Sequence, residues 1–287
     1  MEDQILKPNQ LCDCSINGGI TKSKLSMVQL IVLGMLAGAF IALGAITAAA
    51  ASHSIVNVGV AKLVGGAVFP VGLILVIICG AELFTGNVLL TVPATDKKIK
   101  ISAMLRNWVI VYFANLVGAV IIAFLVYSAG TLNLSAGKLG GAAIKVASAK
   151  ESLPFFTAFC SGILCNMLVC LAVWGASAAK DVFGKILIIW FPIMAFVTCG
   201  FEHSVANMYY LSVGLFAKGN ASYVQASGLA QKKLDLLSVS GAIHNLIPVT
   251  LGNIVGGVFF VGLAYYVVYK HVPNKAAKIA AGVNSSL

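Results

Sequence analysis

The chain has 287 residues, of which 60% are hydrophobic and only 10% are charged. The apolar residues gather into six long blocks, which excludes a soluble or disordered protein and is typical of an integral membrane protein. The formal net charge of +10 does not indicate nucleic-acid binding, because the basic residues lie in short segments beside the blocks and no soluble domain is predicted to present them.

The N-terminal segment, residues 1–25, is polar. It carries Lys7, Lys22 and Lys24 but neither a short apolar core nor a small-residue cleavage site, so it does not read as a cleaved signal peptide. For its structure the sequence leaves two alternatives, a plug for a pore or a disordered segment, and we expect disorder.

Six apolar blocks follow, and each reaches the ~20 residues that a helix needs to cross the hydrocarbon of a bilayer. The sequence therefore predicts an all-α integral membrane protein with a six-helix transmembrane channel domain over 26–270 and a C-terminal tail over 271–287. The predicted spans are 26–50, 63–92, 107–127, 155–179, 186–213 and 241–269.

The orientation of the spans follows from the basic residues. With six spans, both termini lie on one side of the membrane, together with the loops after the second and fourth spans. That side holds 12 basic residues, which are Lys7, Lys22, Lys24, Lys97, Lys98, Lys100, Arg106, Lys180, Lys185, Lys270, Lys275 and Lys278. The opposite side holds 7, which are Lys62, Lys138, Lys145, Lys150, Lys218, Lys232 and Lys233. The positive-inside bias predicts cytoplasmic termini, in the plasma membrane.

The sequence also repeats itself once. "CGAELFTGN" at 79–87 matches "CGFEHSVAN" at 199–207, "GMLAGAFIAL" from Gly34 matches "GILCNMLVCL" from Gly162, and "NWVIVYFANLVGAV" from Asn107 matches "NLIPVTLGNIVGGV" from Asn245. These matches define two repeats of three spans, 26–127 and 155–269. Because three is odd, the second repeat starts from the opposite face, and the two are predicted to be inverted.

The repeated Cys-Gly-x-Glu stretches stand in mid-span, where an unbroken helix prefers Leu, Ile or Val. Inverted-repeat transporters interrupt helices at such corresponding positions, and we expect the second and fifth spans to be interrupted there. A bare carboxylate would repel an anionic cargo, so we expect Glu82 and Glu202 to support the breaks by accepting bonds from the freed backbone amides.

Polar residues near the breaks are candidate site residues. An ionisable group within the membrane is a functional hypothesis, which favours His203, and Thr85 lies in the corresponding region of the first repeat, so the two are expected to meet near the centre. Asn166 and Asn253 fit helix-to-helix hydrogen bonding or pore lining equally well, and His244 and Asn245 read as interfacial or structural.

Metal, cofactor and catalytic chemistry are not indicated. Cys160, Cys165 and Cys170 recur every five residues and cannot share one helical face, there is no CxxC, and the adjacent Glu202 and His203 point about 100° apart. A membrane enzyme would need a ligand spacing or cofactor motif that is absent. A neutral-solute facilitator fits the broken helices, but its Asn-Pro-Ala pair is missing. We expect neither an enzyme nor a cofactor nor a metal site.

The stretches "GAELFTGN", "NMLVCLAVW", "GFEHSVANMY" and "NLIPVTLGNIVGG" resemble the formate/nitrite transporter family from the first span to the sixth. The whole chain is most similar to its hydrosulfide channel branch. The resemblance implies a homopentamer in which each protomer has its own pore in an aquaporin-like fold and conducts small monovalent anions of weak acids.

The resemblance also implies roles for individual residues. Thr85 falls in the loop that interrupts the second span and His203 in the broken fifth span at the pore centre, while Lys150, with Asn166 and Asn253, attracts anions or lines the pore. For Lys150 a solvated loop charge is the alternative. Family positions of the apolar constrictions fall on Phe69, Leu73, Leu83, Phe84, Val169 and Phe196.

These inferences predict a transmembrane channel, most simply for hydrosulfide, with formate or nitrite as further cargo and a proton-coupled carrier as the alternative. A bare anion loses most of its hydration in an apolar constriction at large cost. Protonation near Thr85 and His203, or on the way in, would remove most of that barrier. Gly86 and Asn87 stand where relatives often carry small hydroxyl residues, which leaves cargo choice open.

Overall fold

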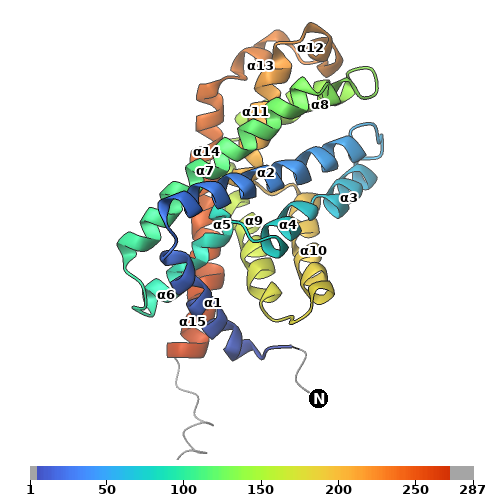
Figure 1. Cartoon of the computed structure of the whole chain (residues 1–287). Coiled ribbons are helices and arrows are strands. Elements are labelled where there is room, and N and C mark those ends of the chain that lie inside the picture. The colour runs from blue at the N-terminus through green and yellow to red at the C-terminus, as the bar shows by residue number, and fades with distance from the viewer. Residues whose placement is uncertain (1–4, 272–287) are drawn as a thin grey trace, which may run out of the picture.

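A computed structural model describes residues 5–271, and these residues form an elongated helical body (Figure 1). The longer elements are α1 (Pro8–Ser23), α2 (Met27–Ser52), α3 (Val58–Val68), α4 (Val71–Ile78), α7 (Ile101–Ser128), α8 (Lys138–Glu151), α9 (Phe155–Ala176), α10 (Val182–Cys199), α11 (Ser204–Lys218) and α14 (Val239–Gly257). The short ones are α5 (Phe84–Asn87), η1 (Val88–Leu90), α6 (Thr91–Thr95), η2 (Thr131–Asn133), α12 (Ala221–Ser227), α13 (Gln231–Leu236), η3 (Val258–Leu263), α15 (Ala264–Tyr266) and η4 (Val267–His271).

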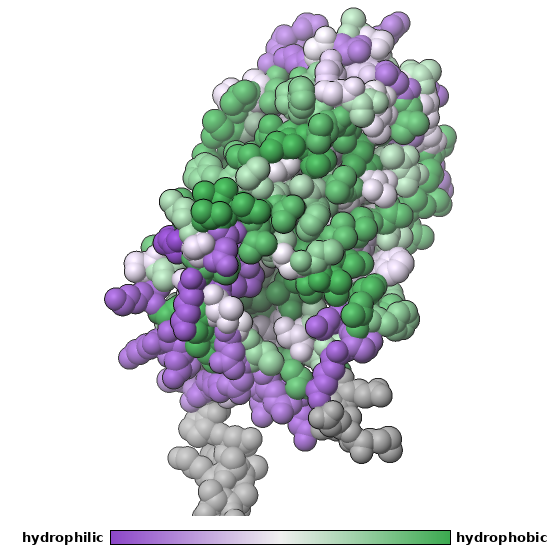
Figure 2. All heavy atoms as spheres, in the orientation of Figure 1, coloured by the Kyte–Doolittle hydropathy of each residue, from purple (hydrophilic) through white to green (hydrophobic). Residues whose placement is uncertain are grey.

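Six segments of the described residues are long and apolar enough to cross a membrane, which confirms the predicted number. They are Met27–Ser52, Val58–Ile78, Ile101–Ser128, Phe155–Ala176, Val182–Cys199 and Val239–His271. Figure 2 shows the matching surface, a hydrophobic band between two hydrophilic ends. The chain is a multi-pass membrane protein. The predicted tail lies almost wholly outside the described residues.

Two spans are interrupted, each at its Cys-Gly-x-Glu stretch. The helix α4 ends at Ile78, Gly80 takes a left-handed φ of 77°, and α5 begins at Phe84. In the same way α10 ends at Cys199, Gly200 has a φ of 74°, and α11 begins at Ser204. This left-handed conformation is accessible to glycine at little cost, so glycine allows each helix to stop in mid-span.

The boundaries of the interrupted spans differ from the predicted ones. The second begins at Val58 rather than 63, because Asn57 caps α3 by accepting a bond from the Val60 amide (3.0 Å). Its part beyond the break consists of the short elements α5, η1 and α6. The fifth begins at Val182 rather than 186, where Asp181 caps α10 by accepting a bond from the Gly184 amide (2.7 Å).

Each half is held together by one closely packed helix pair. In the first half α2 packs on α7, and a Cβ on Gly38 would collide with the carbonyl oxygen of Asn115. In the second half α9 packs on α14, and a Cβ on Gly252 would collide with the carbonyl oxygen of Phe159. Small residues let these backbones touch, as is common in membrane helix pairs.

The N-terminal segment is folded, so the expectation of disorder is wrong for residues 8–23. The helix α1 has Pro8 in its first turn and buries Cys12, Ile16 and Gly19 against η1 and α6. An ion pair joins Asp13 to Lys270 near the end of the last span. Figure 1 places α1 beside α6 and α15, at the opposite end of the body from α8, α12 and α13. One buried stripe and two ion pairs, Asp13 with Lys270 and Lys22 with Glu82, anchor this otherwise polar helix.

Candidate substrate pathway

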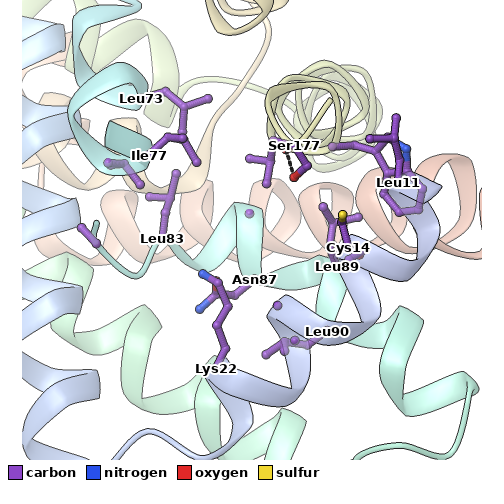
Figure 3. A pocket seen from close by; sticks show the side chains of 18 residues that line it. Leu11, Cys14, Lys22, Leu73, Ile77, Leu83, Asn87, Leu89, Leu90 and Ser177 are labelled. Atoms are coloured by element: carbon purple, nitrogen blue, oxygen red, sulfur yellow. Dashed lines mark hydrogen bonds between the residues drawn. The ribbon is translucent and has the colours of Figure 1, made fainter. Parts of the chain in front are cut away.

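Three cavities that share lining residues lie in sequence between the end of the body at α1 and the end at α8. The α1 vestibule lies under α1 and is lined by Lys22, Asn87, Leu73 and Leu83, among others (Figure 3). The α8 vestibule is lined by Lys62, Lys150, Asn207 and His203, again among others. The central chamber lies between them, sharing Leu73 and Leu83 with the first and His203 with the second.

The central chamber is small and apolar. It has about 180 Å³ of space between atoms and no room for a water-sized sphere. Its lining residues are Ile41, Phe69, Leu73, Leu83, Val169, Ile193, Phe196 and His203. An ion brought here would lose its hydration shell, which is the largest barrier along the path.

Five of the six predicted constriction residues line the chamber, whereas Phe84 does not. The Phe84 ring packs edge-on against Tyr112, with 4.9 Å between the ring centroids, and also against Trp108. Phe84 therefore packs the first break against α7, on the side away from the chamber. Ile41 and Ile193 line the chamber without having been predicted, because nothing in a uniformly apolar span distinguishes the residue that faces inward.

The structure brings Thr85 and His203 together, with 2.9 Å between Thr85 Oγ1 and His203 Nε2. His203 Nδ1 accepts a hydrogen bond from the Ala206 amide (3.0 Å) at the start of α11. A ring nitrogen that accepts carries no proton, so in the neutral ring the hydrogen is on Nε2, which donates to Thr85 Oγ1. The hydroxyl hydrogen of Thr85 is then left to donate to another group.

Glu82 organises the first break through side chains. Its Oε1 accepts from Lys22 Nζ (2.8 Å) and its Oε2 from Asn87 Nδ2 (2.7 Å). The backbone is held by Asn115, whose Nδ2 donates to the Glu82 carbonyl (2.9 Å) and whose Oδ1 accepts from the Phe84 amide (2.9 Å). The asparagine amide thus matches the freed backbone groups, and the carboxylate stays available for a cation.

Glu202 organises the second break in the same way. Its Oε1 accepts from Lys150 Nζ (2.8 Å) and its Oε2 from Asn207 Nδ2 (2.5 Å). Asn253 Nδ2 donates to the Glu202 carbonyl (2.9 Å), and its Oδ1 accepts from the Ser204 amide (2.9 Å). The sequence analysis predicted that each carboxylate would accept hydrogen bonds from the freed amides of its own break. Among the described residues neither carboxylate does so. The geometry of an asparagine, which both donates and accepts, suits a broken helix better.

Asn253 and Asn166 differ in what they leave for a solute. Besides its two bonds at the break, Asn253 donates to the Gly162 carbonyl (2.9 Å), so its amide is fully used between helices. Asn166 Nδ2 donates to the carbonyls of Thr85 (3.2 Å) and Asn253 (2.7 Å), while its buried Oδ1 has no protein partner in the part of the chain that the structure describes. The helix-to-helix alternative describes the Asn253 contacts, and Asn166 retains one acceptor beside Thr85.

Lys22 is a site residue that the sequence analysis missed. It comes from α1 and donates to Glu82 Oε1 (2.8 Å) and to Asn87 Oδ1 (2.8 Å), and Figure 3 shows its side chain reaching toward Asn87. Lys22 precedes Gly34 by 12 residues, and Lys150 precedes Gly162, which aligns with Gly34, by the same 12. This spacing was the available signal. It extends each repeat upstream to include a helix, α1 or α8, that carries a lysine to the break.

The described residues contain no group of three or more His, Cys, Asp and Glu side chains that could hold a metal ion. The two buried carboxylates at the breaks are neutralised by lysines. The arrangement puts the His203 ring on an apolar chamber between two lysine-bearing vestibules.

Comparison with known proteins identifies the family. A family profile described as formate/nitrite transporter matches residues 9–267. The chain is 43% identical over 266 residues to a probable formate transporter of Methanothermobacter thermautotrophicus, covering 86% of this chain and 91% of that protein. It is 37% identical over 270 residues to the formate channel FocA of Escherichia coli K12, covering 92% and 95%.

Solved structures agree. An FNT family ion channel matches with a TM-score of 0.80 and 33% identity over 92% of this chain and 99% of that one. A pentameric formate channel with formate bound matches with a TM-score of 0.76 and 36% identity over 85% and 97%. The aquaglyceroporin of Plasmodium falciparum, at 17% identity and a TM-score of 0.50 over 82% and 96%, shares the fold alone. The relatives named here are channels and transporters, so this chain is a membrane transport protein and not an enzyme. It belongs to the formate/nitrite transporter family.

Proposed function

We propose that the protein is a channel for small monovalent anions of weak acids, with formate as its first cargo. The observation that carries this proposal is the Thr85–His203 pair, 2.9 Å apart, in which His203 lines an apolar chamber that lies between two lysine-bearing vestibules. Basic vestibules favour anions, and a dry chamber opposes ions. A weak acid satisfies both conditions, because it can approach as an anion and cross as a neutral molecule.

The central pair would stabilise the cargo at the narrowest point. With His203 Nε2 donating to Thr85, the Thr85 hydroxyl donates its own hydrogen to a carboxylate or similar oxygen arriving in the chamber. Protonation of the cargo there, or in a vestibule, removes the cost of dehydrating a charge. The free acceptor Asn166 Oδ1 supplies the next polar group beside Thr85.

Lys150 acts at the α8 vestibule at contact range. Its ammonium is paired with Glu202 and lies 5.4 Å from the centre of the Tyr210 ring, with 14% of its side chain exposed. The remaining N–H bonds can meet an arriving anion. Lys22 has the corresponding role in the α1 vestibule.

The larger assembly follows the same proposal. The matched contacts of the two breaks support inverted repeats around a pseudo-twofold axis in the membrane plane, an aquaporin-like arrangement. The pentameric formate channel among the similar structures supports a homopentamer with one pore per protomer. The 12 to 7 distribution of basic residues supports a plasma-membrane topology in which the α1 vestibule and both termini face the cytoplasm.

The order of cargoes rests on the named relatives. The sequence analysis put hydrosulfide first, whereas the relatives with a named cargo carry formate, which we therefore place before hydrosulfide and nitrite. A proton-coupled carrier is the alternative to a channel, and it would need a conformational change of the protein for each acid that crosses.

The test is initial uptake of formate, nitrite and hydrosulfide into proteoliposomes from about pH 5 to pH 8, for the wild type and for Thr85→Val. Valine keeps the shape of threonine, so this variant removes the hydroxyl alone. We expect formate to move fastest, more rapidly at low pH, and Thr85→Val to slow it without altering assembly. Uptake of every anion at the rate of empty liposomes would refute the proposal, and pH-independent passage of glycerol would favour a neutral-solute facilitator.

A further inference from the structure

The two lysines of the α8 vestibule differ in their electrostatic surroundings. Lys150 Nζ lies 2.8 Å from Glu202 Oε1, and the Glu202 side chain is only 7% exposed. Lys62, on the first turns of α3, is exposed and forms no ion pair among residues 5–271. One vestibule thus holds a neutralised charge and an uncompensated one.

The range of attraction follows from this difference. A lysine paired with a carboxylate acts on a distant anion as a small dipole, and the field of a dipole falls faster with distance than that of a single charge. At physiological salt the screening length is about 8 Å, so only an uncompensated charge at the mouth affects anions arriving from solution. Among the residues that line the α8 vestibule there is no carboxylate to oppose Lys62.

The Lys62 ammonium also lies close to the second break. A Cβ on Gly200 would lie 3.9 Å from Lys62 Nζ, which puts the ammonium beside the break that ends α10. The C-terminal end of a helix carries about half a negative charge, which favours a cation there and offsets part, not all, of the lysine charge. Lys62 therefore stands between solution and the His203 end of the chamber.

We propose that Lys62 sets the long-range attraction of anions into the α8 vestibule, whereas Lys150 acts only on an anion already inside. The inference rests on the proposed function. It assigns to Lys62 an effect on the concentration of cargo at the mouth of the vestibule and not on passage through the chamber.

The experiment compares the full-length wild type with Lys62→Gln, Lys62→Arg and Lys62→Glu in proteoliposomes. Initial formate uptake is measured against formate concentration at low and at high ionic strength. Lys232→Gln is the matched control, because Lys232 is an exposed lysine on α13 that does not line the vestibule.

At low ionic strength we expect Lys62→Gln to raise the half-saturating formate concentration about 2–5-fold and to leave the maximal rate unchanged. Lys62→Glu should raise it further, Lys62→Arg should match the wild type, and high salt should bring all variants together. Lys232→Gln should behave as the wild type.

A loss of maximal rate without a change in half-saturation would overturn the inference, since it would mean that Lys62 supports the structure. So would a Lys62→Gln curve that matches the wild type, or an equal effect of Lys232→Gln. If Lys62→Gln does not assemble, the half-saturating formate concentration of the wild type and of Lys62→Arg is compared at low and at high ionic strength. A half-saturating concentration that does not change with salt overturns the inference. A wild type that carries no anion overturns the proposed function and this inference together.

Discussion

The two breaks are built alike but do not do the same work. Each joins a lysine, a glutamate and three asparagines: Lys22, Glu82, Asn87, Asn107 and Asn115 in the first half, and Lys150, Glu202, Asn207, Asn245 and Asn253 in the second. The aligned stretches differ at five positions, Ala81 against Phe201, Leu83 against His203, Phe84 against Ser204, Thr85 against Val205 and Gly86 against Ala206, and the two polar side chains that meet, Thr85 and His203, are both among them. The repeated residues form the scaffold, and the chemistry lies where the repeat has diverged.

This division explains why, among the described residues, His203 alone brings a polar group to the lining of the chamber. A strictly symmetric chain would bring either two histidines or two leucines to the centre. Here His203 crosses from the second half to bond Thr85 of the first half, so the site exists only between the halves. The two breaks share one set of residues, and the positions at which they differ make one contact that neither break could make alone.

The largest expected effect comes from removing the asparagine that holds a break. Asn115→Ala and Asn253→Ala each remove three hydrogen bonds and leave two buried groups at the break without their partner, the carbonyl of Glu82 or Glu202 and the amide of Phe84 or Ser204. Unsatisfied buried groups cost about 1–3 kcal/mol each, so we expect a loss of ~2–6 kcal/mol in either half and poor recovery of folded protein. Thermal unfolding in detergent measures this. A variant of one half that unfolds like the wild type would show that the two scaffolds are not equivalent.

The next effect comes from making the halves more alike. His203→Leu copies Leu83 and removes both the bond to Thr85 and the cap on the Ala206 amide. We expect formate flux to fall about 10–100-fold, because a lost hydrogen bond of ~1.5–3 kcal/mol at the barrier changes the rate by that ratio. His203→Asn is the matched control, since asparagine caps helices well but is too short to replace the ring. Equal, low flux with normal assembly in both variants supports a role at the centre, whereas wild-type flux in His203→Asn would reduce His203 to a cap.

Much of this comparison could be predicted from the sequence. Apolar blocks fixed six spans, and a carboxylate in mid-span next to a glycine marked each break, because such residues have no place in an unbroken membrane helix. The internal match then aligned Glu82 with Glu202. These signals are strong because, inside a bilayer, the hydrogen bonds of the backbone and the pairing of charged side chains can be satisfied in only a few ways.

Other features depend on distances along the chain that no local pattern records. Lys22 contacts Glu82, which lies 60 residues further along the chain. The helix α1 buries only three of its residues, so the composition of this segment predicts a polar, disordered stretch. Phe84 points away from the chamber toward Tyr112, and Ile41 points into it, because side-chain direction at a break follows from the packing of neighbouring helices.

Removing the lysine of each break should destabilise the two halves by different amounts, because the two lysines differ in exposure. The Lys150 side chain is 14% exposed and that of Lys22 is 37% exposed, while both glutamates are 7% exposed. Water can replace the Lys22 ammonium more readily, so Lys22→Met should cost less than about 1 kcal/mol and Lys150→Met ~1–3 kcal/mol. Thermal unfolding of both variants tests the order. Adding Glu202→Gln to Lys150→Met should recover part of the loss, and an order reversed between the halves would contradict this reading.

The smallest effect concerns a position where the two upstream helices differ. Glu151 on α8 stands where α1 has Ser23, by the same offset of 128 residues that relates Lys150 to Lys22. Its Oε2 accepts from the Ser238 amide (3.1 Å), and its buried Oε1 has no partner among the described residues. Burial raises the pKa of Glu151 from 4.5 to about 7, an effect that the Ser238 bond and Lys218 only partly oppose.

The direction of the pH dependence follows from that shift. Between about pH 4.5 and pH 7 the unfolded chain releases a proton that the folded chain retains, so the stability contributed by this group is present below pH 4.5 and is lost as the pH rises to 7. Glu151→Gln keeps an acceptor for Ser238 and cannot ionise, so it should flatten the curve and stabilise the protein at pH 8 by ~1–3 kcal/mol, a few degrees in Tm. Asp235→Asn, at a neighbouring exposed carboxylate on α13, should leave the slope unchanged. Thermal unfolding at pH 5 and pH 8 measures both, and a Glu151→Gln slope equal to the wild type would mean that Glu151 is ionised in the folded protein.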